Sequence, residues 1–359
     1  MTPGSRASGT PRDVRLCLLG YGNVARAFCD LLARQERQLA DRHGLRLLVN
    51  AVGTRHGSLL APGGLPPAAV LATIGARPAP PQAPLPAAEL LAASAADILV
   101  ELTVLEHDGA PLSTGHVLAA IELGMHVVTA NKGPIAWNWR GIADVARAAE
   151  RRVRFESAVM DGLPVFSLLD FTLPDCALLG FEAVFNATTN SILEAMGSGQ
   201  SLADALADAQ AQGFAEADPS NDLDGWDAAY KAAALANVAM DARMTPLDVA
   251  RERLTDVPLQ RVLRAREHGK RLRLVTSVRR ETPAGVAPEA GSATSAGPIR
   301  ACVQAAELDI DHPLAALSGD SLGVVLHTDL MGDLVVSELH GLVPQTAYGV
   351  YADILHICA

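Results

Sequence analysis

Short apolar runs alternate with segments of helical periodicity over residues 13–160. Each run has the length of a buried strand, and most of them are followed by a turn and a helical pattern. The runs are Val14–Leu19, Leu45–Val52, Asp97–Thr103, Met125–Ala130 and Val153–Val159. This alternation is typical of an α/β domain. The pattern predicts a parallel sheet covered by helices over residues 13–160, preceded by a disordered tail at residues 1–12.

The periodicity changes over residues 161–342. Leu179–Asn190 alternates like a sheet strand, and a helix is predicted from Gly225 to Met240. Strand-like runs return after Lys270, on both sides of Thr282–Gly297, a Gly-, Ala-, Pro- and Ser-rich segment that indicates a flexible hairpin connection. We expect a second, α+β domain with a mostly antiparallel sheet, and a final helix over residues 343–359 that packs back on the first domain.

The first strand runs directly into residues 20–25, Gly-Tyr-Gly-Asn-Val-Ala. Between a strand and a helix, Gly-x-Gly-x-x-Ala is the dinucleotide fingerprint of a Rossmann domain: one glycine permits the tight turn and the next lets the backbone approach a pyrophosphate. We therefore predict that Gly20, Gly22, Asn23 and Val24 bind a nicotinamide cofactor. The alternative is a glycine-rich turn that binds no ligand.

Polar side chains also follow the other predicted strands. No carboxylate follows the second strand to bind a ribose 2′-hydroxyl, whereas Arg55 suits a 2′-phosphate, so NADP is favoured and NAD is the alternative. Thr103 and Lys132 lie at strand ends where open α/β sheets bind ligands. Lys132 is a candidate for catalysis or for pairing with substrate charge, or else an exposed loop lysine. Ser113 or Thr114 is expected to cap the intervening helix.

Carboxylates gather in residues 214–231, just before a lysine. They are Glu216, Asp218, Asp222, Asp224 and Asp227, and Lys231 ends the stretch. If a helix begins near residue 224, the last carboxylate and the lysine stand four residues apart on one face. The alternative is a solvated helix start, where such a pair contributes roughly 0.2–0.5 kcal/mol.

Composition narrows the possible partners. The net charge of −11 argues against nucleic-acid and anionic-membrane partners, which need basic surface. No apolar run reaches the length of a membrane-spanning helix. The five cysteines show no Cys-x-x-Cys spacing, which indicates free thiols in a reducing cytoplasm.

The motifs together resemble homoserine dehydrogenase. The resemblance covers nearly the whole chain, and it rests on residues 20–25, 131–134 (Asn-Lys-Gly-Pro), 186–190 (Asn-Ala-Thr-Thr-Asn) and 216–231. It implies an NAD(P)H-dependent reduction of L-aspartate 4-semialdehyde to L-homoserine, in threonine and methionine biosynthesis, by a cytoplasmic homodimer whose second domain binds the substrate. The chain leaves no room after its last helix for an ACT regulatory domain, so we expect the short form of the family.

The resemblance also implies roles for individual residues. Lys231, Lys132 and Asp227 would be catalytic, with the two lysines at the reacting oxygen. Substrate would be held by Glu216, Asp222, Thr189 and Asn190. Glu156, Val159 and Asp161 fall where the family binds a monovalent cation such as Na⁺ or K⁺.

Two departures from the family pattern keep alternatives open. Met160-Asp161 replaces residues that are more often small, and Gly341 lies in a run that differs from the usual Gly-Ala-Gly. A paralogue that reduces another amino-acid semialdehyde or oxo acid is one alternative. The other is a catalytically silent NADP-binding sensor.

Overall fold

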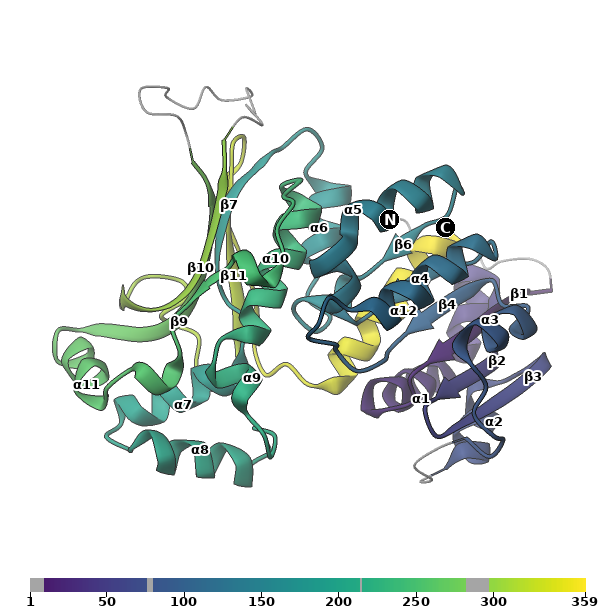
Figure 1. Cartoon of the computed structure of the whole chain (residues 1–359), viewed down its shortest axis with the longest axis horizontal. Coiled ribbons are helices and arrows are strands. Elements are labelled where there is room, and N and C mark those ends of the chain that lie inside the picture. The colour runs from purple at the N-terminus through teal and green to yellow at the C-terminus, as the bar shows by residue number, and fades with distance from the viewer. Residues whose placement is uncertain (1–9, 76–79, 214, 282–296) are drawn as a thin grey trace. The chain divides into compact units, whose positions relative to one another are not determined.

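The computed structural model describes residues 10–75, 80–213, 215–281 and 297–359. The chain forms two compact units, each with its own sheet (Figure 1). Unit 1 contains the residues up to Pro134 together with Asn138–Gly162 and Leu342–Ala359; unit 2 contains Ile135–Trp137 and Leu163–Gly341. The predicted hairpin insert and most of the predicted N-terminal tail lie outside the described residues.

The sheet of unit 1 has six strands in the order β3-β2-β1-β4-β5-β6. They are β1 (Arg12–Leu19), β2 (Leu45–Thr54), β3 (Gly57–Leu65), β4 (Ile98–Glu101), β5 (His126–Thr129) and β6 (Val153–Arg154). All neighbouring strands pair in parallel except β2 and β3, which form an antiparallel hairpin. This is a Rossmann-type sheet, in which ligands bind beyond the carboxyl ends of the strands where the strand order reverses.

Helices pack against this sheet, and their apolar side chains form the core of unit 1 together with those of the strands. They are α1 (Asn23–Gln38), α2 (Pro67–Ile74), α3 (Ala87–Ser94), α4 (Pro111–Glu122), α5 (Lys132–Ala148, with non-helical geometry at Asn138) and α12 (Val343–Cys358). Although α12 comes from the end of the chain, Val350 and Ile354 pack in one apolar cluster with Phe28 of α1 and Leu16 of β1. Figure 1 shows this helix, in yellow, among the elements of unit 1.

The sheet of unit 2 has the order β12-β11-β7-β9-β10-β8, and all its neighbours pair antiparallel except β10 and β8. Its strands are β7 (Leu178–Val184), β8 (Ala250–Arg251), β9 (Lys270–Arg280), β10 (Ile299–Asp309), β11 (Leu322–Thr328) and β12 (Gly332–Glu338). Its helices are α6 (Val165–Thr172), α7 (Ala187–Gly197), α8 (Leu202–Ala211), α9 (Ser220–Leu223), α10 (Trp226–Ala239) and α11 (Leu259–Glu267). The predicted combination of a Rossmann domain and a mostly antiparallel second sheet is confirmed.

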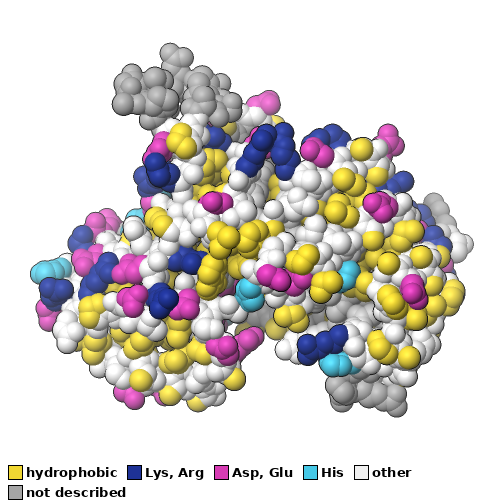
Figure 2. All heavy atoms as spheres, in the orientation of Figure 1, with side chains coloured by type: hydrophobic (Ala, Val, Ile, Leu, Met, Phe, Trp, Pro, Cys, Tyr) yellow, Lys and Arg dark blue, Asp and Glu magenta, His cyan; other side chains and the backbone are white. Residues whose placement is uncertain are grey.

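The face of the molecule drawn in Figure 2 is mixed in charge. On the face seen in Figure 2, lysine and arginine side chains are interspersed with acidic ones, so they do not form a continuous basic patch there. Within the described ranges, no helix combines the length and the apolar character needed to cross a membrane. All five cysteines are free, and burial raises the pKa of Cys17 and of Cys29 to about 12.

Candidate active site

The glycine-rich turn of unit 1 has the geometry of a dinucleotide site. Gly20 has φ of +92°, and a Cβ added there would lie 2.3 Å from the Leu102 carbonyl oxygen, so only glycine fits. A Cβ on Gly22, in contrast, would meet nothing within 4 Å, which leaves open space beside the backbone. Helix α1 begins at Asn23 and Val24, and its N-terminal N–H groups favour a phosphate at this position.

Arg55 lies in the turn between β2 and β3, beyond the carboxyl end of β2. Its side chain is exposed, and its Nε lies 2.8 Å from Nε2 of His56. Because β2 pairs directly with β1, this turn follows the strand next to the one that leads into the glycine-rich turn. Arg55 therefore lies just after the strand whose end distinguishes the two ribose substituents in Rossmann domains.

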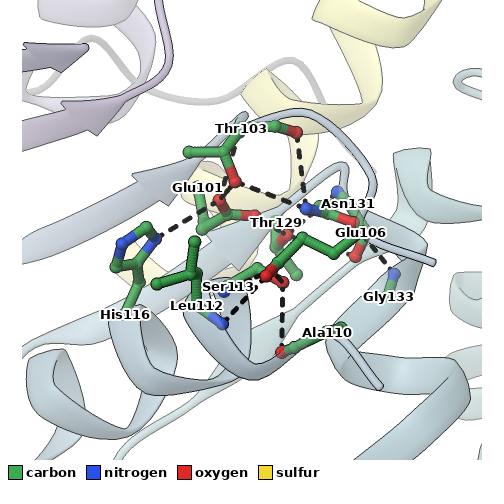
Figure 3. Close-up of polar contacts among 10 residues, drawn as sticks. All are labelled: Glu101, Thr103, Glu106, Ala110, Leu112, Ser113, His116, Thr129, Asn131 and Gly133. Carbon is green, nitrogen blue, oxygen red and sulfur yellow. Dashed lines mark hydrogen bonds and ion pairs between the residues drawn. The ribbon is translucent and has the colours of Figure 1, made fainter. Parts of the chain in front are cut away.

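Thr103 and Lys132 follow the carboxyl ends of β4 and β5, as predicted. Figure 3 shows Thr103 there, next to Glu101 and Asn131. The Thr103 hydroxyl donates to the buried carboxylate of Glu101. Lys132 is the first residue of α5, and Asn131 caps this helix by accepting from the Gly133 N–H at 2.9 Å. These contacts fix the backbone at the edge of the sheet where a cofactor is expected.

The expectation that Ser113 or Thr114 caps α4 is wrong. The helix begins two residues earlier at Pro111, a residue that suits the first turn because it lacks the N–H that would need a partner. Glu106 accepts instead from the N–H groups of Leu112 at 3.1 Å and Ser113 at 2.8 Å (Figure 3). Sequence reasoning missed Glu106 because the capping carboxylate precedes the helix by several residues.

All three predicted cation ligands belong to unit 1. Glu156 and Val159 are buried, and Asp161 has a left-handed φ of +46°. The Thr346 hydroxyl donates to Asp161 Oδ1 at 3.0 Å, and the Glu156 N–H donates to Asp353 Oδ2 at 2.8 Å. A buried carboxylate and neighbouring backbone carbonyls are oxygen donors, which suit a hard cation.

Unit 2 brings three of the predicted residues into one polar cluster. Lys231 Nζ lies 2.9 Å from Asp227 Oδ2 on α10 and donates to the Phe185 carbonyl oxygen at 2.6 Å. Asn186, directly after β7, donates through Nδ2 to Asp222 Oδ1 at 2.8 Å and to Asp227 Oδ2 at 3.0 Å. Asn186 also caps α7 through its side-chain oxygen. The cluster thus combines one cation and two carboxylates, which α9 and α10 supply.

The electrostatics of this cluster are set by its partial burial. The side chains of Asp227 and Lys231 are each only 14% exposed. Burial, followed by the charge of Asp227, raises the pKa of Asp222, although hydrogen bonds from Asn186 and Thr188 and the charge of Lys231 act in the opposite direction. Two carboxylates held this close repel each other unless a cation lies nearby. Lys231 supplies one such cation, and a substrate ammonium would supply a second.

The remaining predicted substrate residues have different environments. The Glu216 side chain is exposed on the segment that precedes α9, outside the hydrogen bonds of the cluster. Thr189 is buried in the first turn of α7, where its N–H donates to Asn186 Oδ1 at 2.9 Å. Asn190 is buried and donates to the Gly319 carbonyl oxygen at 3.1 Å. The contacts of Thr189 and Asn190 support the backbone around the cluster.

Two sequence families match the chain in succession. The NAD-binding domain of homoserine dehydrogenase matches residues 20–156, and the homoserine dehydrogenase family matches residues 164–355. The NAD(+)-dependent homoserine dehydrogenase of Pseudomonas canavaninivorans is 33% identical over 352 residues, which cover 96% of each chain. Homoserine dehydrogenase of Mycobacterium tuberculosis is 33% identical over 350 residues, which cover 97% of this chain and 73% of the relative.

Solved structures agree with these sequence matches. Homoserine dehydrogenase from Thermoplasma acidophilum aligns with a TM-score of 0.81 and 27% identity, covering 96% of this chain and 99% of its own. A hyperthermophilic archaeal homoserine dehydrogenase in complex with NADPH aligns with a TM-score of 0.78 and 25% identity, covering 96% and 98%. With its Rossmann unit and its cluster of two carboxylates and a lysine, the chain belongs to the homoserine dehydrogenase family of NAD(P)-dependent oxidoreductases.

Proposed function

We propose that the protein catalyses the reversible reduction of L-aspartate 4-semialdehyde to L-homoserine with NAD(P)H. The observation that carries this proposal is the Lys231–Asp227 ion pair beside Asp222, at 2.9 Å and largely withdrawn from solvent. An amino-acid semialdehyde presents an ammonium and a carbonyl. The cluster offers carboxylates to the ammonium and a cation to the carbonyl oxygen.

The mechanism assigns different tasks to the cluster residues. The dinucleotide, when bound, supplies the hydride. Hydride addition builds alkoxide charge on the substrate oxygen, and Lys231 stabilises that charge and supplies the proton. Asp227 and the Phe185 carbonyl oxygen hold the ammonium of Lys231 in place through their 2.9 and 2.6 Å contacts. Lys132 serves the same step as a second cation.

Carboxylates and buried polar residues hold the substrate in this proposal. Asp222, with Glu216, pairs with the substrate ammonium. Thr189 and Asn190 shape the backbone beneath it. Arrival of an ammonium next to Asp222 would favour the ionised form of a carboxyl group whose pKa burial has raised.

The cofactor preference follows from the turn after β2. We propose that Arg55 pairs with the 2′-phosphate of NADP, because a planar guanidinium suits phosphate oxygens. The exposed position of Arg55 and the absence of a carboxylate among residues 53–57 support this preference. The relative from Pseudomonas canavaninivorans is NAD(+)-dependent, so NAD is the competing cofactor in every assay.

We propose that a monovalent cation such as Na⁺ or K⁺ binds Glu156 together with the carbonyl oxygens of Val159 and Asp161. The left-handed geometry at Asp161 and its link to Thr346 support an ordered turn at this place. Activity measured in tetramethylammonium buffer, with and without added K⁺, tests this assignment. Equal activity in both buffers would contradict it.

We also propose that the enzyme acts as a cytoplasmic homodimer. The free cysteines support a reducing compartment. Exposed apolar side chains lie on or beside the edge strand β12, including Leu330, Met331, Val335 and Leu339. Such a group on an edge strand suits contact with a second copy. Light scattering of the purified protein at several concentrations would show a dimer, and a monomer throughout would contradict the proposal.

A substrate panel tests the proposed reaction. Initial rates of NADPH and NADH oxidation are measured with L-aspartate 4-semialdehyde, with longer amino-acid semialdehydes and with 2-oxo acids. The proposal requires that aspartate semialdehyde has the highest kcat/KM. A paralogue would prefer another carbonyl compound, and a silent sensor would bind NADPH without oxidising it.

A further inference from the structure

Glu101 is the centre of a polar network at the carboxyl ends of β4 and β5 (Figure 3). Its carboxylate is fully buried. Oε1 accepts from the N–H of Thr103 at 3.1 Å and from the Thr103 hydroxyl, while Oε2 accepts from the Thr129 hydroxyl at 3.0 Å. His116 Nδ1 lies 3.8 Å from Oε1. A buried carboxylate is costly unless it is hydrogen-bonded or paired, so Glu101 holds its donors firmly.

One arm of the network reaches the glycine-rich turn at residues 20–25, called the cofactor turn below. The Leu102 N–H donates to the Leu19 carbonyl oxygen at 2.7 Å. A Cβ on Gly20 would lie 2.3 Å from the Leu102 carbonyl oxygen and 2.9 Å from the Thr103 nitrogen. The backbone that Glu101 fixes through Thr103 is therefore packed directly against the glycine-rich turn.

The other arm reaches Lys132. The Thr129 hydroxyl, which donates to Glu101, also accepts from the Asn131 N–H at 3.0 Å. The Asn131 side chain then accepts from the Gly133 N–H at 2.9 Å and donates to the Thr103 carbonyl oxygen at 3.3 Å. The backbone is thus held on both sides of Lys132, and it is tied back to the segment that contacts the cofactor turn.

We propose that Glu101 and Thr129 are positioning residues, which hold Lys132 in a fixed place relative to the cofactor turn. The inference rests on the proposed role of Lys132 in the reaction. Thr129 acts through the hydrogen bond that it accepts from the Asn131 N–H, next to Lys132. Glu101 acts indirectly, through the hydrogen bonds that it accepts from Thr129 and Thr103. Their removal should therefore lower kcat in folded enzyme.

Thr129→Val is the sharpest test. Valine keeps the β-branched shape in β5 but removes both the donor to Glu101 and the acceptor of the Asn131 N–H. Thr129→Ser, the matched control, keeps the hydroxyl. With saturating NADPH and semialdehyde, we expect kcat to fall about tenfold in Thr129→Val, because small misplacements of catalytic groups cost this much or more. Thr129→Ser should stay within about twofold of the wild type, because its hydroxyl can form both hydrogen bonds.

A double-mutant cycle separates positioning from general damage. In a Lys132→Ala background, Thr129→Val should cause no further loss of kcat, because the group that it misplaces is gone. Glu101→Gln provides a second variant if valine at position 129 lowers the yield of folded protein, and it should show the same dependence on Lys132. The unfolding midpoint of each variant confirms that folded protein is compared.

Three results would overturn the inference. Equal kcat values for the Val and Ser variants would show that the hydroxyl is not needed. An equal loss in the Lys132→Ala background would show a structural defect that does not act through Lys132. A near-normal kcat of Lys132→Ala alone would overturn the proposed role of that lysine, and the inference with it. This result can be distinguished from the other two because it appears in the single variant.

Discussion

Replacement of Lys231 by methionine removes the ammonium from the acidic cluster while keeping the length of the side chain. In the structure this ammonium lies 2.9 Å from Asp227 Oδ2 and 2.6 Å from the Phe185 carbonyl oxygen. A positioned proton donor contributes about 10²- to 10⁴-fold to a rate. We therefore expect kcat to fall by a factor in that range, which corresponds to about 3–5 kcal/mol in activation free energy.

The same replacement should also lower stability, but by less. Removing one partner of a fully buried ion pair costs about 3–5 kcal/mol. Here both side chains keep 14% exposure, and Asn186 still donates to Asp227 after the change. We expect a loss of about 1–3 kcal/mol in the free energy of unfolding, which leaves a folded enzyme to assay.

The assay compares kcat at saturating substrates with the dissociation constant of NADPH, measured by fluorescence. The control is Lys270→Met, which breaks another lysine–aspartate pair, at 3.1 Å from Asp309, where the lysine side chain is 36% exposed. Lys270→Met should retain normal kcat. The reasoning is refuted if Lys231→Met keeps kcat within about threefold of the wild type, since that is far below the contribution of a proton donor.

Three further predictions concern the cofactor turn and the acidic cluster. Arg55→Ala should raise the KM for NADPH about tenfold and that for NADH less than about twofold, because only NADPH loses a charge-assisted contact; equal effects would place the preference elsewhere. Gly20→Ala should destabilise the protein by about 2–4 kcal/mol in chemical denaturation, because the new Cβ would meet the Leu102 carbonyl oxygen at 2.3 Å in a left-handed backbone, and an unchanged midpoint would contradict this. Asp222→Asn should weaken substrate binding but raise the free energy of unfolding at neutral pH, because burial and the charge of Asp227 raise the pKa of Asp222. A carboxyl group whose pKa is raised in the folded state stabilises the protein at low pH, and this stabilisation is lost as the pH rises through the folded-state pKa. The stability difference between the asparagine variant and the wild type should therefore shrink as the pH falls to the ordinary aspartate pKa of 3.8. A stability difference that is independent of pH would contradict this assignment.

The features that could be predicted well from the sequence are those that depend on residues close together in the chain. The glycine-rich turn at residues 20–25 and the i, i+4 pair of Asp227 and Lys231 both depend on local spacing, and both have the predicted geometry. The buried strands β1 and β4 follow from short apolar runs in the same way. Local patterns were sufficient to predict these features because each turn, helix or strand is determined by residues that are neighbours in the sequence.

Contacts between distant residues could not be predicted in the same way. Asn186 joins Asp222 and Asp227 from 36 and 41 residues away, and nothing in the local pattern distinguishes this asparagine from an ordinary helix cap. Likewise β3 was missed, because its proline and glycines resemble a loop and its pairing with β2 supplies the strand geometry. The network of Glu101 required the register of β4 against β5, which only the fold determines.

The central claim, that this chain interconverts an amino-acid semialdehyde and its alcohol, is tested most directly in the oxidative direction. Purified protein is mixed with L-homoserine and either NADP⁺ or NAD⁺, and the absorbance of the reduced cofactor is followed. We predict cofactor reduction that requires homoserine, that is faster with NADP⁺, and that Lys231→Met nearly abolishes. Absence of cofactor reduction with both cofactors, in protein that still binds NADPH, would contradict the account.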